Sequence, residues 1–116
     1  MDFKKQRSIY QQIADQLCDR IAAGEWKPDE RIVSVRDLAT ELQVNVNTVM
    51  RSFERLQWQE IIYTRRGMGY YVAPDGPSKV AALQRQQFLE EVVPALRQRM
   101  RQLGITVKDL EQYLNQ

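Results

Sequence analysis

Two short amphipathic helices in close succession constrain this chain more than any other feature. Ser34, with Asp37 three positions later, has the form of a helix N-cap, and apolar residues at helical spacing follow as far as Leu42. Asn45 then caps another helix, whose predicted buried face ends at Leu56. Two short helices separated by about four residues have the spacing of a helix-turn-helix.

The flanking segments extend this pattern on both sides. Residues 8–23 predict an amphipathic helix, with Ile9 and Ile13 at the start of its apolar stripe and Gly24 as its stop. Residues 61–64 and 70–72 are β-branched and aromatic, and the turn between them is rich in glycine and arginine. Helix, helix-turn-helix and hairpin is the order of a winged helix, so we expect a mostly α fold with a small β-hairpin.

The chain is organised differently after residue 74. Residues 75–78 hold no apolar side chain, so we expect residues 1–74 as the winged helix, 75–78 as a linker and 79–116 as a two-helix tail. Pro94 lies inside the long predicted helix and should kink it without ending it. Two helices cannot form a core alone, so we expect a homodimer. Alternating spacings of four and three predict its seam at Leu89, Val93, Leu96 and Met100.

Composition excludes several classes of function. The chain of 116 residues has no histidine and one cysteine, Cys18, so catalytic triads, histidine-containing metal sites and internal disulfides are excluded. No catalytic cluster is recognisable, so we expect no enzyme, no metal and no cofactor. There is no apolar run of membrane-spanning length and no signal peptide, which predicts a cytoplasmic protein without membrane contact. We expect Cys18 to be a small core residue.

Several polar residues are candidates for contact with double-stranded DNA. With Val49 facing inward, Asn47, Met50, Arg51 and Glu54 would face outward from the second helix of the helix-turn-helix. Asparagine and arginine are the side chains that read adenine and guanine edges. An alternative is that Asn47 and Arg51 are only solvated surface residues. The position of this helix and the basic hairpin beside it favour DNA.

Phosphate contacts are predicted at two further places. Arg36 lies in the first turn of its helix, where the helix N-terminus also favours an anion, and Ser34 could donate to the same phosphate. Arg65 and Arg66 flank Gly67 at the hairpin tip, although an ordinary turn with solvated arginines would look the same. The net charge is only +2, so binding would rest on a few placed arginines. A winged-helix protein-interaction module that does not read DNA is the alternative function.

The motifs together resemble the GntR family of bacterial transcription regulators over about residues 7–73. The matching segments are 9–13, 21–24, 34–39, 44–49 and 65–69. The sequence of residues 45–50 and the short tail resemble those of the YtrA subfamily, whose tail helices serve dimerisation. We expect a repressor, and a two-fold dimer predicts a palindromic operator. The resemblance suggests control of an adjacent transporter operon. It does not identify a small-molecule effector.

The resemblance also assigns residues. The DNA-contacting positions of the family that match this chain are Arg36, Asn45, Asn47, Thr48, Arg66 and Gly67. Many relatives carry arginines at the positions held here by Val46 and Met50, so Arg51 could take over part of the contact. Gln43 and Glu60 stand where the family has glycines, and a left-handed Gln43 would cost about 1 kcal/mol.

Overall fold

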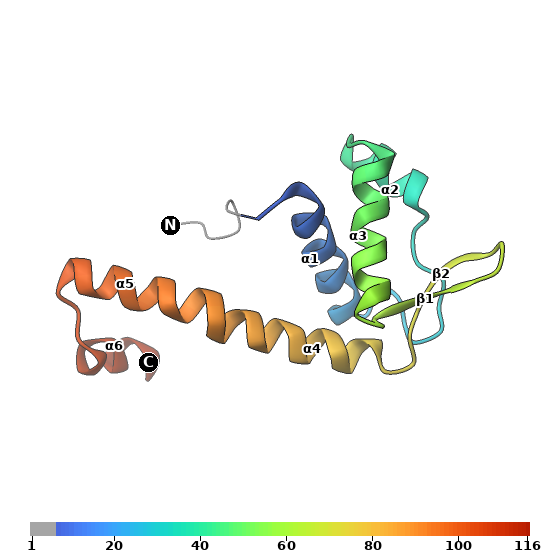
Figure 1. The fold of residues 1–116 in the computed structure, drawn as a ribbon. Coiled ribbons are helices and arrows are strands. Elements are labelled where there is room, and N and C mark those ends of the chain that lie inside the picture. The colour runs from blue at the N-terminus through green and yellow to red at the C-terminus, as the bar shows by residue number, and fades with distance from the viewer. Residues whose placement is uncertain (1–6) are drawn as a thin grey trace.

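The computed structural model describes residues 7–116 and shows a winged helix with a long helical tail (Figure 1). The predicted fold class, mostly α with a small antiparallel hairpin, is confirmed. The elements are α1 (Ile9–Ala22), α2 (Val35–Leu42), α3 (Val46–Trp58), β1 (Ile62–Arg65), β2 (Gly69–Val72), α4 (Gly76–Gln87), the π-helical segment η2 (Phe88–Val92), α5 (Val93–Leu103) and α6 (Val107–Leu114).

Helix α1 begins with a capping box. The backbone N–H of Gln11 donates to the Ser8 hydroxyl over 3.3 Å, and the Ser8 N–H donates to the Gln11 side chain over 3.0 Å. The buried face begins at Ile13, one turn later than predicted, and Ile9 is exposed. Ile9 is the first residue of the helix and lies beyond the rim of the core, so the prediction that it belongs to the buried stripe is wrong.

The helix-turn-helix is closed by the predicted caps. Ser34 Oγ accepts the N–H of Asp37 over 3.1 Å, and Asn45 Oδ1 accepts the N–H of Asn47 over 2.7 Å. Between the two helices Gln43 ends α2 in the left-handed conformation, with φ of 56°. A side chain in this conformation is strained by about 1 kcal/mol relative to glycine. The tight turn therefore forms at a small cost in stability.

The hairpin is joined to the rest of the core along the outer edge of β2. Strands β1 and β2 pair from Ile62 with Val72 to Arg65 with Gly69. The extended piece predicted around Ile32 runs beside β2, because the Ile32 N–H donates to the Tyr70 carbonyl over 2.9 Å. The wing is thus held by the main chain as well as by side chains.

The segment predicted as a linker, residues 75–78, is instead the N-cap and first turn of α4. Gly76 is buried so closely that a Cβ there would lie 2.8 Å from the Ile61 carbonyl oxygen. Pro77 suits the first turn of a helix because its missing N–H would have no partner there. Val80, one turn further, belongs to the winged-helix core. The core therefore continues into the start of the tail, and the functional division of the chain stays a prediction.

The tail continues as one rod through α4, η2 and α5, and α6 then turns back beneath α5 (Figure 1). The Val93 N–H donates to the Phe88 carbonyl five positions earlier, so a π-helical bond lies directly before Pro94. The helix continues past Pro94, as predicted. Gly104 ends α5 in the left-handed conformation, and Thr106 with Asp109 caps α6. No residue of α5 or α6 is buried.

Polar contacts fix the first part of the tail against α1. Arg7 Nε lies 2.8 Å from Asp15 Oδ2, and Arg7 Nη1 lies 3.1 Å from Glu91 Oε1 in η2. Gln84 of α4 donates to Asp19 of α1 over 2.8 Å. The direction in which the tail leaves the winged helix is therefore set by polar contacts between α1 and the face of α4 and η2 turned toward it.

Cys18 is buried in the core facing α4, as predicted. Burial, together with the nearby carboxylates of Asp15 and Asp19, raises the pKa of its thiol to about 12. The thiol is therefore neutral at physiological pH. Over residues 7–116 the structure has no helix long and apolar enough to cross a membrane. Across the same range no three histidine, cysteine or carboxylate side chains gather into a metal site.

Candidate nucleic-acid interface

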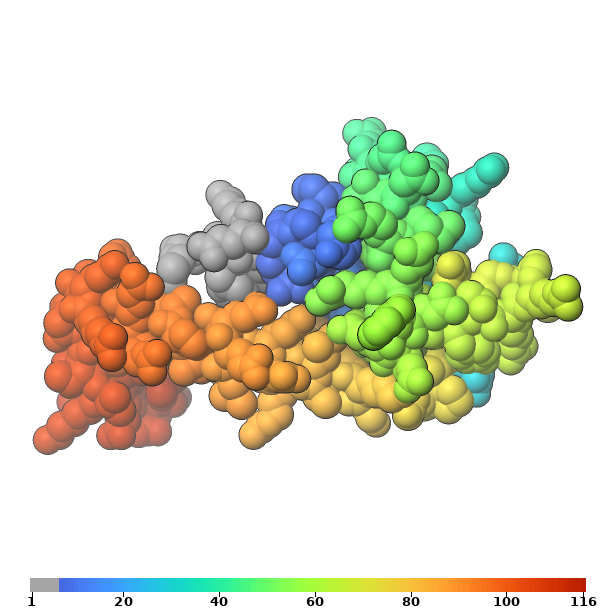
Figure 2. All heavy atoms as spheres, viewed as in Figure 1, coloured from blue at the N-terminus to red at the C-terminus, as the bar shows by residue number. Residues whose placement is uncertain are grey.

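The three predicted contact regions lie at the end of the molecule away from the tail. Figure 2 shows the hairpin tip and the parts of α2 and α3 nearest the turn projecting at this end, while α5 and α6 form the other. The molecule measures 56 × 28 × 22 Å, so the two ends are well separated. We call the surface formed by the start of α2, the start of α3 and the hairpin tip the recognition surface.

The first turn of α3 exposes most of its predicted contacts. Asn45 and Asn47 are exposed, and Thr48 is half-buried. The cap uses the carbonyl oxygen of the Asn45 side chain, so its amide N–H groups remain for another partner. Asn47 contributes only its backbone N–H to the cap. Its side-chain amide carries both the donor and the acceptor needed to read an adenine edge.

Arg51 is exposed and held in a defined place. Its guanidinium carbon lies 4.2 Å from the centroid of the Tyr10 ring in α1. The Ser52 hydroxyl, which is fully buried, lies 2.8 Å from the Tyr10 carbonyl oxygen and 3.2 Å from that of Thr48. The start of α1 is thereby fixed to α3, and the Arg51 charge lies over the junction of the two helices.

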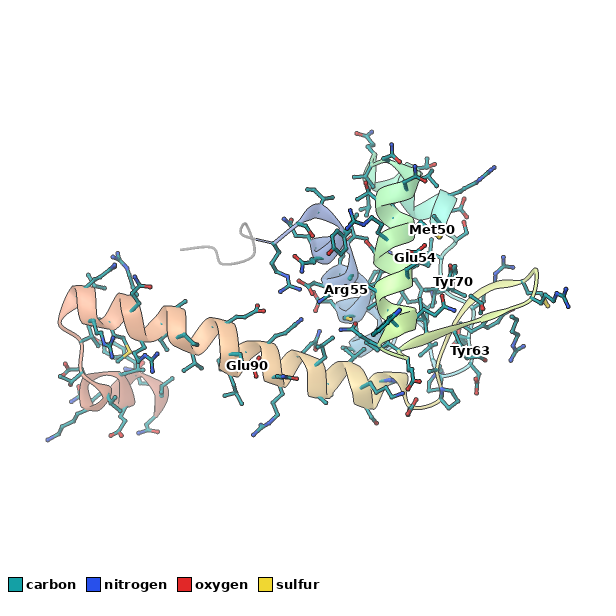
Figure 3. The ribbon with its side chains drawn as sticks, in the orientation of Figure 1. Met50, Glu54, Arg55, Tyr63, Tyr70 and Glu90 are labelled. Atoms are coloured by element: carbon teal, nitrogen blue, oxygen red, sulfur yellow. The ribbon has the colours of Figure 1, made fainter. Side chains whose placement is uncertain are left out.

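Met50 does not face outward as the helical angle predicts. It is half-buried, and its sulfur accepts a hydrogen bond from the Tyr70 hydroxyl over 3.7 Å. Figure 3 shows Met50 and Tyr70 together between α3 and the hairpin. The Tyr70 ring also packs edge-on against Phe53, with centroids 4.9 Å apart. The reason for the error is the wing itself, because β2 covers this side of α3. Glu54, by contrast, is exposed as predicted.

The Tyr70 hydroxyl keeps its proton in this position. Burial raises the pKa of Tyr70, and the carboxylate of Glu54 raises it further. The hydroxyl is therefore available as a donor to Met50 throughout the physiological pH range. The wing and α3 are joined by a contact that does not titrate near neutral pH.

Arg36 stands at the start of α2, exposed, in the first turn. Ser34 is half-buried and its oxygen accepts the capping bond, so its hydroxyl hydrogen remains as a donor. The free N–H groups of a helix start favour an anion, and the guanidinium adds a charged fork. The local arrangement suits a phosphate group.

The two arginines of the wing differ in their surroundings. Arg66 and Gly67 are exposed at the tip, and Gly67 has a left-handed φ of 73°. Arg65 lies over the Tyr71 ring at 4.5 Å and donates to the Tyr63 hydroxyl over 3.2 Å. This hydrogen bond raises the pKa of Arg65. The Tyr63 hydroxyl in turn donates to Asp29 over 2.7 Å, so Arg65 belongs to a network along the hairpin.

Arg31 is a basic residue of the wing that the sequence analysis missed. Its guanidinium packs against Gly69, where an added Cβ would lie 2.9 Å from Arg31 Nε. Arg31 is exposed and its backbone bridges to Tyr71 of β2. The available signal was its place beside the buried Ile32 in a predicted extended segment, which puts its side chain on the opposite face.

Comparison with known proteins places the chain in a family. The model described as "Bacterial regulatory proteins, gntR family" matches residues 9–72. The HTH-type transcriptional regulator YhcF of Bacillus subtilis is 31% identical over 108 residues, 93% of this chain and 88% of that protein. The HTH-type transcriptional repressor YtrA of Bacillus subtilis is 37% identical over 73 residues, 63% of this chain and 56% of that protein.

A solved structure agrees over nearly the whole chain. The crystal structure of a GntR-family transcriptional regulator from Bacteroides thetaiotaomicron is 42% identical, with a TM-score of 0.76, and the match covers 93% of this chain and 94% of that one. The similarity to the family and to YtrA-like members confirms the resemblance drawn from the motifs. The same similarity confirms that the chain is a transcription regulator and not an enzyme. It favours DNA binding over the alternative of a module that binds only protein. The chain belongs to the gntR family of bacterial regulatory proteins and is a DNA-binding transcription regulator.

Proposed function

We propose that this regulator is a homodimeric repressor that binds a palindromic operator, with one recognition surface on each half-site. The observation that carries the proposal is the uncovered apolar face along the tail, at the opposite end from the recognition surface. The hairpin and the starts of α2 and α3 make the DNA contacts, and the tail makes the contact with the second subunit. The residues that contact DNA are those of the recognition surface.

The apolar face follows the predicted seam. Leu89, Val93 and Leu96 are exposed, Leu96 to 41%, and Met100 is half-buried. Phe88 and Leu103 are exposed beside them. A continuous row of large apolar side chains along a helix is rare on a monomer and marks an interaction surface. A second copy of the same helix, placed by a two-fold axis, would cover it.

The π-helical segment alters one detail of this seam. Leu89 lies within η2, whereas Val93, Leu96 and Met100 follow in regular α-helix or at its first residue. The wider turn moves Leu89 around the axis relative to the other three. We therefore place the centre of the dimer contact at Leu96 and its neighbours in α5.

A two-fold dimer accounts for the operator form. Each α3 would enter a major groove with its first turn toward the base edges, and each wing would lie over the flanking backbone. Half-sites would be about one helical turn apart, roughly 34 Å, or a multiple of that. Repression is supported by the named repressor YtrA among the relatives. Control of a neighbouring transporter operon, from the cytoplasm where bacterial DNA lies, rests on the YtrA resemblance.

Selection of genomic fragments tests this proposal. The purified regulator is mixed with sheared DNA of its own genome, and the retained fragments are sequenced and footprinted. We expect a small set of palindromic sites that overlap promoters, with two protected half-sites. Retention of fragments without a shared sequence would contradict operator recognition. A single asymmetric half-site would contradict the dimer.

Repression is tested on the recovered promoters. Transcription from each promoter is measured with and without the regulator, and a promoter with a scrambled site is the control. We expect lower transcript levels only from intact sites. Higher levels would show an activator.

A further inference from the structure

The start of α3 exposes an aliphatic side chain among polar ones. Val46 is the first residue of the helix and is 43% exposed. Within residues 35–58, which the structure describes in full, Trp58 is the other exposed large apolar residue. Trp58 ends the helix about 18 Å away, at a rise of 1.5 Å per residue. Val46 is therefore the exposed large apolar side chain of the two helix starts in the recognition surface, while Met68 is exposed at the hairpin tip.

The neighbours of Val46 on α3 do not offer a second exposed aliphatic group. The carbonyl oxygen of the Asn45 side chain is occupied by the cap, and Met50, one turn further along α3, is held by Tyr70. Asn47 lies next to it with an exposed amide. The first turn of α3 thus presents one branched hydrocarbon group and one amide group side by side.

Valine in a helix has one strongly preferred side-chain rotamer. Its two methyl groups therefore stand in a fixed place and lose little freedom when they meet a partner. A polar base edge placed against them would lose its hydrogen bonds to water without gaining any from the protein. In the major groove the one base that presents an apolar group is thymine, through its C5-methyl.

We infer that Val46 determines specificity by contacting the C5-methyl group of a thymine in each operator half-site. The inference rests on the proposed operator recognition and identifies one base of each half-site. The side-chain amide of Asn47, in the adjacent position, would read an adenine next to that thymine or opposite a neighbouring one. The half-site therefore contains an A·T pair at the start of α3.

The test removes the methyl group from the DNA and the aliphatic group from the protein. An operator is first selected by the wild-type regulator from a random duplex library. It is then resynthesised with deoxyuridine in place of one thymidine at a time, and the ratio of Kd values for the two duplexes is measured. The same series is measured for Val46→Ser. Val107→Ser is the matched control, because Val107 is also an exposed valine at the first position of a helix, in α6.

We expect one thymine in each half-site at which loss of the methyl group weakens wild-type binding about fourfold, the effect of one buried methyl group. Val46→Ser should bind the thymine operator about fourfold more weakly and show a ratio near one at that position. Val107→Ser should keep the wild-type ratio whatever its effect on the dimer. Circular dichroism establishes that each variant is folded.

Two results distinguish a failure of the Val46 assignment from a failure of operator recognition. If the wild type enriches no sequence from the library, operator recognition fails, and the role of Val46 fails with it. If an operator is enriched but no thymine responds to deoxyuridine, or Val46→Ser keeps the full response, only the assignment of Val46 is overturned.

Discussion

At the scale of single residues, the arginines of the recognition surface differ in how firmly the fold holds them. Arg51 lies over Tyr10 and Arg65 lies over Tyr71, so both guanidinium groups are placed before DNA arrives. Arg36 and Arg66 are exposed at a helix start and at a loop tip. A long side chain loses rotamer freedom when it binds, and a stacked one has lost part of it already. We expect the stacked Arg51 and Arg65 to orient the protein on the DNA. We expect Arg36 and Arg66 to bind phosphate groups.

Replacing the exposed pair tests their role. The double variant Arg36→Ala/Arg66→Ala should bind the selected operator at least about tenfold more weakly, and its salt slope should fall by about four, because two phosphate contacts are lost in each subunit of the dimer. A gel-shift titration across a salt series measures both quantities. The control Arg85→Ala/Lys108→Ala removes the same charge from exposed tail positions and should leave the slope unchanged. Equal binding by the first variant and the wild type would contradict the predicted interface.

The buried thiol gives a second prediction at this scale. Because the pKa of Cys18 is about 12, the reactive thiolate is scarce at pH 8 in the folded protein. Iodoacetamide should alkylate Cys18 at least about 100-fold more slowly in buffer than in denaturant, as followed by mass spectrometry. Comparable rates would show that the core around α1 opens readily.

At the scale of elements, the helix-turn-helix forms although its turn holds a side chain in a conformation suited to glycine. Gln43 has φ of 56°. The caps at Ser34 and Asn45 and the buried faces of both helices stabilise the arrangement enough to offset the strain. The turn is therefore a place where a single substitution should stabilise the protein.

Gln43→Gly should raise the free energy of unfolding by about 0.5–1 kcal/mol, since the relief of strain exceeds the extra entropy of glycine in the unfolded chain. Thermal unfolding followed by circular dichroism should show a midpoint about 3 °C higher. Gln16→Gly is the matched control at an exposed position inside α1, and it should lower stability by about 1 kcal/mol. A loss of stability in Gln43→Gly would refute the strain at this turn.

Local sequence predicted these elements well, because the forces that define them act within about four residues. The cap formed by Ser34 with Asp37 and the cap at Asn45 were recognisable from the sequence alone and are confirmed. The linker at 75–78 was predicted wrongly for the opposite reason. Whether Gly76 starts a helix depends on the Ile61 carbonyl against which it packs, and that neighbour is 15 positions away along the chain.

At the scale of the whole molecule, the tail places two recognition surfaces relative to one another. The contacts of Arg7 with Asp15 and Glu91 fix the rod to α1, so a dimer formed at α5 would have a defined separation between its two α3 helices. The apolar face of α5 is uncovered in a single copy. Dimer formation and operator binding should therefore be lost together.

Leu96→Asp puts a charge at the centre of the proposed seam. We expect a monomer by light scattering and operator binding at least about 100-fold weaker, because the two half-sites no longer act together. Gln98→Asp, at an exposed position of α5 outside the predicted seam, is the control and should remain a dimer. A full-strength Leu96→Asp dimer would place the subunit contact elsewhere.

The sequence by itself determined the order of the elements, their caps, and the family to which they belong, since periodicity and capping are local properties. The tertiary structure alone decided that Met50 is covered by the wing, that Arg65 is held along the hairpin while Arg66 stays at its tip, and that Arg31 joins them. These outcomes depend on Tyr70, Tyr71 and Gly69, which meet their partners only after the chain has folded. A helical angle gives the direction of a side chain, but only the packing of distant segments determines what covers it.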